Sequence, residues 1–236
     1  MLTDPRRFSR IVAAFALIVA PVLVLAGMIA TPWEAEPTTA SYHDALAAHP
    51  GQSEVAATLL HFGYLLLLPA ALGIMHLARR ATPKLAHIGG LLAAAGLASL
   101  PGLLVTDFYD LALAEALPRA QSVAISDATQ ESWAGALMGI STIFPVLIGT
   151  VVLADAAYRA GVAPLWAPFA LTIGWLLPLV SGTGLVPAVA GALLIGAVLV
   201  PIGVKAARMS DQAWAERPAA RTTRLKAPKI AAESAA

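Results

Sequence analysis

The chain has 236 residues, of which 58% are hydrophobic and 12% are charged, with a formal net charge of +1 and a mean hydropathy of +0.76. A soluble domain carries about twice this charged fraction. The composition therefore excludes a cytosolic globular enzyme, a disordered protein and a nucleic-acid-binding protein, and it indicates an integral membrane protein. Because the sequence contains no cysteine, disulfides, thiolate metal sites and c-type haem attachment are excluded as well.

Apolar stretches long enough to cross a bilayer occur along most of the chain. A transmembrane helix needs about 20 predominantly apolar residues. Six stretches meet this requirement, and they are Ile11–Ala30, Val55–Leu77, Ala86–Thr106, Trp133–Ala154, Ala163–Ser181 and Leu185–Val204. We predict an all-α bundle of six transmembrane helices over residues 1–205, joined by loops, of which 31–54 and 107–132 are the longest. A cleaved signal peptide is the alternative for the first stretch, although its apolar run exceeds the usual length of about 7–15 residues.

Lysine and arginine are distributed unequally between the two ends of these spans. The segments before the first span and after the second, fourth and sixth spans hold 14 of the 15 basic residues. Arg119 falls on the opposite side, together with nine of the 14 acidic residues. Cytoplasmic loops of membrane proteins are enriched in basic residues, so both termini are predicted to be cytoplasmic, in the plasma (inner) membrane of a bacterium. Residues 206–236 are predicted to form a basic, disordered tail that lies near anionic lipid at the cytoplasmic face.

Prolines and small residues suggest how the predicted helices bend and pack. Proline inside a helix removes one backbone hydrogen bond and bends the helix, and we interpret Pro69 and Pro145 as hinges. Small residues at four-residue spacing allow close helix packing in membranes. They are predicted to form seams inside the bundle or contacts with a second copy or a membrane partner, and they are Gly135 and Gly139; Gly90, Ala94, Ala98 and Gly102; and Ala188, Ala192 and Gly196.

His61 is the leading candidate for a functional residue inside a span, because ionisable groups there are costly unless paired or hydrated. Tyr64 follows at i+3 on the same helix face. Asp107 and Asp110 directly follow the third apolar stretch and share a face if that helix continues outward. We predict an outward-facing pocket in which these four side chains bind a cation or a polar solute. The alternative is that His61 binds a backbone carbonyl while the carboxylates are hydrated at the interface.

His76 and His87 form a second candidate pair, since the first ends the second span and the other begins the third. Two facing imidazoles at similar depth can ligate b-type haem, although two interfacial histidines near lipid headgroups explain the same residues. His43 and His49 lie in the long acidic loop, where their spacing fits no metal site. We interpret these two histidines as loop residues.

The function expected from these features is that of a non-enzymatic membrane protein. The leading hypothesis is a small permease-like protein or accessory membrane subunit with an outward-facing polar pocket. The alternatives are a membrane redox protein that binds haem b through His76 and His87, and a purely structural partner subunit assembled through the small-residue faces. No motif of an NTPase, zinc protease, serine hydrolase or potassium channel occurs in the chain.

Overall fold

The computed structural model describes residues 4–180 and 184–216, and these residues form helices without any strand. Helix accounts for 86% of the structure, which confirms the predicted all-α class. The helices are α1 (Pro5–Ala30), α2 (Thr39–Ala48), α3 (Pro50–Ala78), α4 (Pro83–Ala116), α5 (Arg119–Glu131), α6 (Trp133–Arg159), α7 (Ala167–Val180), α8 (Leu185–Ala207) and α9 (Asp211–Ala215).

Five of these helices, α1, α3, α4, α6 and α8, are long and apolar enough to cross a membrane, and they indicate a membrane protein. The fifth predicted span, Ala163–Ser181, corresponds to α7, which has 14 residues rather than the expected 19. Two features shorten it. Gly161 adopts a left-handed φ of +65° that ends α6, and Pro164 lies in the turn that follows.

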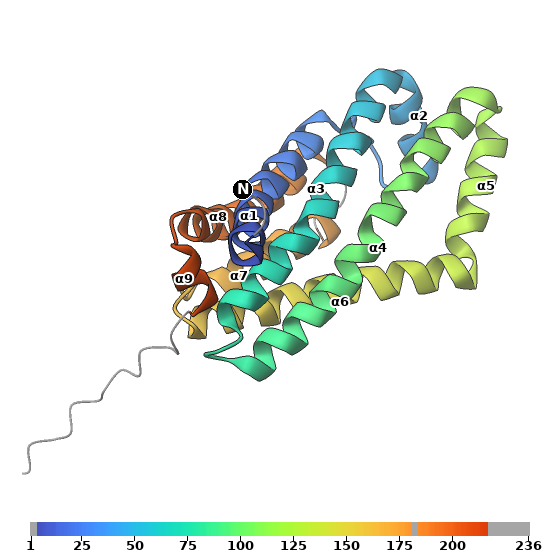
Figure 1. The fold of residues 1–236 in the computed structure, drawn as a ribbon. Helices are drawn as coiled ribbons and strands as arrows, with labels where there is room; N and C mark the ends of the chain where they lie inside the picture. The colour runs from blue at the N-terminus through green and yellow to red at the C-terminus, as the bar shows by residue number, and fades with distance from the viewer. Residues whose placement is uncertain (1–3, 181–183, 217–236) are drawn as a thin grey trace, which may run out of the picture.

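The six longer apolar helices pack in a closed ring, in the order α1, α3, α4, α6, α7 and α8, and α8 returns to α1. Helix α3 also contacts α6 across the ring. Figure 1 shows α2 and α5 together at one end of the molecule, and the N-terminus and α9 toward the other. We call these the capped end and the basic end.

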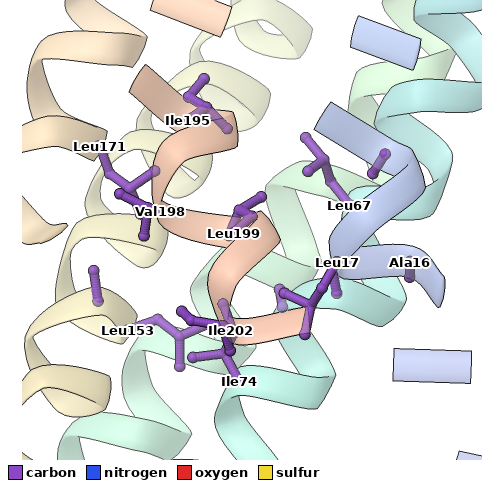
Figure 2. Packing of buried hydrophobic residues seen from close by; sticks show 14 of the residues in the cluster. Ala16, Leu17, Leu67, Ile74, Leu153, Leu171, Ile195, Val198, Leu199 and Ile202 are labelled. Carbon is purple, nitrogen blue, oxygen red and sulfur yellow. The ribbon is translucent and has the colours of Figure 1, made fainter. Parts of the chain in front are cut away.

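The core lies between α8 and its neighbours in the ring. Ile195, Val198, Leu199 and Ile202 project from α8 and are almost fully buried. Figure 2 shows them among side chains of α1, α3, α6 and α7, including Leu17 and Leu153. Close packing of these side chains against neighbouring helices provides van der Waals contacts that stabilise helix association in a membrane, so this cluster sets the position of α8.

Helices α4 and α6 approach each other along a seam of small residues. A Cβ atom added to Gly89 would lie 2.6 Å from the backbone nitrogen of Leu153, and one added to Gly96 would lie 2.6 Å from that of Val146. The seam on α4 is thus offset by one residue from the predicted face, because Gly90 contacts Met75 of α3 instead. A Cβ atom added to Gly102 or Gly139, two of the predicted seam residues, would meet no atom of another part of the described chain within 4 Å.

Two segments predicted as loops contain helices that cover the capped end. Helix α2 lies within 31–54, where the Thr38 side chain accepts a hydrogen bond from the backbone N–H of Ser41 at its first turn. Helix α4 continues to Ala116, ten residues beyond the predicted Thr106, and ends where Leu117 becomes extended before Pro118. Helix α5 then connects α4 to α6. A search for long apolar stretches does not find α2 and α5, because these two helices are short and polar.

The beginning of the predicted disordered tail is folded. Helix α8 continues to Ala207, and α9 packs against α1. Trp214 of α9 is 2% exposed and stacks on the His76 ring, with the ring centroids 4.3 Å apart. An ion pair of 2.9 Å between Arg10 and Asp211 adds a second connection to α1. The remainder of the predicted tail, residues 217–236, lies outside the described residues.

Candidate functional site

A cavity of about 240 Å³, lined by polar and apolar side chains, lies at the capped end, among α1, α3, α4, α2 and the 31–38 connection. Three carboxylates line it, from Glu34, Glu54 and Asp107, and its lining contains no lysine, arginine or histidine. Aromatic rings of the lining come from Trp33, Tyr42, Tyr64 and Phe108. We call this cavity the acidic pocket.

Asp107 and Tyr42 are hydrogen-bonded to each other in the acidic pocket. The Tyr42 hydroxyl donates to Oδ1 of Asp107 over 3.0 Å. Burial, and then the nearby Asp107 carboxylate, raise the pKa of the Tyr42 phenol well above its usual value. The phenol therefore remains a donor at neutral pH and orients the Asp107 carboxylate.

Tyr64 lies where the acidic pocket meets a second cavity. This apolar cavity, also about 240 Å³, lies inside the helix ring, and Met28 and Tyr64 line both cavities. Tyr64 is 8% exposed and stacks on Trp175 of α7, with ring centroids 6.4 Å apart. Its hydroxyl has no hydrogen-bond partner in the described part of the chain. The buried side-chain polar atom without a partner among the described residues is instead Nε1 of Trp175, which lines the apolar cavity. A buried donor without a partner is costly in free energy, so Trp175 favours a ligand atom that accepts a hydrogen bond.

The structure brings together two of the four residues that we predicted to form the binding site. Tyr64 and Asp107 both line the acidic pocket. His61 is not part of that lining; its ring packs edge-on against Phe62, with ring centroids 5.4 Å apart. Asp110 belongs to a different cluster, because it accepts a hydrogen bond of 2.5 Å from the Ser126 hydroxyl on α5.

His43 is the centre of that other cluster, which sequence reasoning missed when it treated His43 as a loop residue. The ring is 2% exposed; Nδ1 lies 3.1 Å from the Ser122 hydroxyl and Nε2 lies 3.0 Å from the Ser126 hydroxyl. Asp110 Oδ1 is 3.5 Å from Nε2. Ser122 and Ser126 are four residues apart, so they share one face of α5. The partners lie about 80 positions after His43, and local spacing cannot reveal them.

Further polar contacts attach α2 to α5 around this cluster. Arg119 makes a bidentate ion pair with Asp44, with an Nε–Oδ1 distance of 2.8 Å, and Thr39 donates to Asp127 over 2.5 Å. Hydrogen bonding with Arg119 lowers the pKa of the Asp44 carboxyl. Helix α2 has few apolar contacts of its own. These polar links therefore hold α2 in place over the acidic pocket.

The two histidines of the haem hypothesis are each bound elsewhere. His76 Nε2 lies 3.0 Å from the carbonyl oxygen of Trp214, and His87 Nδ1 lies 2.7 Å from the carbonyl oxygen of Pro83 on its own helix. Within the described residues, the rings of His76 and His87 make no contact with each other. The described part of the chain also contains no group of three or more His, Asp or Glu side chains arranged for a metal ion.

The proposed hinge prolines both lie inside continuous helices, Pro69 in α3 and Pro145 in α6. The stretch of α6 before Pro145 is exposed on several sides, with Leu137, Met138 and Ile140 each more than half exposed. Their role as hinges stays a prediction.

Comparison with known proteins gives no further assignment, since no protein family, curated protein or solved structure matches this chain.

Proposed function

We propose that the chain crosses the plasma membrane six times, with both termini in the cytoplasm and the capped end outside. Large exposed apolar side chains around the ring support contact with lipid, among them Phe15, Leu91, Phe144 and Phe169. The placement of 14 of the 15 basic residues supports the orientation, because it puts the basic end in the cytoplasm.

The short helix α7 fits this topology as the fifth of the six crossings. Its 14 residues span about 21 Å, less than the hydrocarbon core of about 30 Å. Leu171 near its start lies with Leu153 and Leu199, whereas Pro178 near its end lies with Ala188 at the beginning of α8. Helix α7 therefore runs from the basic end toward the capped end, as a fifth crossing requires.

We infer that the protein binds a small organic cation in the acidic pocket, as a permease-like protein or as an accessory subunit that captures the solute. The observation that carries this proposal is the set of three carboxylates without a basic side chain in one cavity. A cleft lined by one sign of charge raises the local concentration of counter-ions.

The aromatic side chains of the acidic pocket favour an organic cation over a metal ion. Trp33, Tyr42, Tyr64 and Phe108 line the same cavity as the carboxylates. Aromatic faces attract quaternary ammonium groups, and each such contact is worth about 0.5–2 kcal/mol. A hard divalent cation instead requires several oxygen ligands at close range.

Calorimetry with tetramethylammonium chloride on the protein in nanodiscs tests this function. Asp107→Asn removes the charge that the Tyr42 phenol orients and should weaken binding at least tenfold. Glu115→Gln is the matched control, since Glu115 is an exposed acid on the same helix outside the pocket lining, and it should have little effect. Absence of binding to the wild-type protein, or equal binding to both variants, would contradict the proposal.

Flux measurements separate the two forms of the proposal. A permease reconstituted alone in liposomes takes up radiolabelled tetramethylammonium, and Asp107→Asn reduces that uptake. An accessory subunit binds the cation with the same dependence on Asp107 but gives no uptake without its partner.

A further inference from the structure

We propose that the ligand is an amphiphilic cation, with its charged head in the acidic pocket and its apolar tail in the apolar cavity beneath it. This inference rests on the proposed function, because it assigns the tail of the same ligand. Its basis is that the two cavities, each about 240 Å³, are adjacent and share Met28 and Tyr64.

The two cavities differ sharply in chemistry. The acidic pocket carries the three carboxylates, whereas the apolar cavity is lined by aliphatic side chains of the ring helices, with Tyr64 and Trp175 as its polar-tipped members. A ligand that fills both must therefore be charged at one end and apolar at the other.

Tyr64 lies at the junction of the two cavities. Its side chain is 8% exposed, it borders both cavities, and its hydroxyl has no partner in the described part of the chain. The Tyr64 ring would therefore contact the first methylenes of the tail, next to the charged head.

The size of the expected effect follows from burial of the tail. Each methylene removed from water strengthens binding about fourfold. Hexyltrimethylammonium has the head of tetramethylammonium and a water-soluble tail, so it should bind at least tenfold more tightly even when part of the tail remains outside.

A pair of variants on α6 tests where the tail lies. Leu147 lines the apolar cavity, so Leu147→Trp fills it, whereas neighbouring Ile148 is 49% exposed and absent from the lining. Ile148→Trp is therefore the control for the same change in volume.

The experiment is calorimetric titration of the nanodisc-embedded protein with tetramethylammonium, hexyltrimethylammonium and neutral hexanol. We expect Leu147→Trp to reduce hexyltrimethylammonium binding to the affinity of tetramethylammonium, without changing the latter, and Ile148→Trp to change neither. Equal affinity of the two cations for the wild type, or no effect of Leu147→Trp on the difference, overturns the assignment of the tail and leaves the proposed function standing. Hexanol binding as tightly as hexyltrimethylammonium overturns the amphiphilic cation, and failure of both cations to bind overturns the proposed function as well.

Discussion

The position of α2 over the acidic pocket depends on His43, and replacing this residue with alanine should release the helix. The ring makes two contacts, with Ser122 and Ser126, and is 2% exposed. Each lost hydrogen bond costs about 0.5–1.5 kcal/mol, and the unfilled volume adds to this cost. The two serine hydroxyls keep their other acceptors, Arg119 O and Asp110. We therefore expect His43→Ala to lower the opening free energy of α2 by about 2–4 kcal/mol.

Hydrogen exchange of the α2 amides measures this opening directly, because exchange of protected amides reports the free energy of local unfolding. A change of about 2–4 kcal/mol accelerates exchange about 30- to 1000-fold where opening limits it. His49→Ala is the control, since His49 is exposed at the end of the same helix and its side chain makes no hydrogen bond within the described residues. Similar exchange in both variants would refute the argument that the buried His43 cluster holds α2 in place.

Three further predictions concern the seam between α4 and α6, helix α9 at the basic end, and the ion pair between Arg119 and Asp44 at the capped end. Gly89→Ala should destabilise the protein by about 1–3 kcal/mol through overpacking, whereas Gly102→Ala, which meets nothing within 4 Å, should be neutral or stabilising in thermal unfolding. Trp214→Ala should abolish the exchange protection of α9 but leave the ring helices protected, since its buried side chain anchors that helix; loss of protection throughout would contradict a local role. Arg119 lowers the pKa of Asp44, so their pair stabilises the cap above the usual Asp pKa of about 4, and this contribution is lost as the pH falls through the lowered value. The difference in α2 exchange between wild type and Asp44→Asn should therefore vanish in acid, and a difference that grows there would be inconsistent with the pair.

Hydropathy located the long helices because crossing a bilayer requires a property that is local in sequence, a run of about 20 apolar residues. It did not locate α2 or α5, whose polar residues are used to bind each other. Thr39 and Asp127, for example, are 88 positions apart and meet through the fold. Pro118 forces Leu117 out of the helix and ends α4, but the prediction relied on hydropathy alone and ended this helix at Thr106.

Part of the candidate site could be predicted from the sequence, because it too depends on features that are local in sequence. Continuation of α4 beyond the apolar stretch placed Asp107 at the capped end, and the alignment of α3 beside α4 placed Tyr64 near it. Glu34 and Glu54 reach the pocket from other elements, so no spacing rule pointed to them. Asp110, which we grouped with Asp107 by its i+3 spacing, turns instead toward Ser126.

The absence of cysteine allows one measurement to test the central claim, an outward-facing cavity that attracts cations. Half-buried Leu104 lines the acidic pocket, so a single cysteine in the Leu104→Cys variant reports on it, and exposed Ala128 on α5 provides the reference position. Intact cells are treated with membrane-impermeant methanethiosulfonates that carry either trimethylammonium or sulfonate. We predict labelling from outside, with a preference for the cationic reagent about tenfold greater at Leu104→Cys than at Ala128→Cys, equivalent to about 1.4 kcal/mol. Labelling only in opened cells would contradict the orientation, and equal preference at the two positions would contradict the cation site.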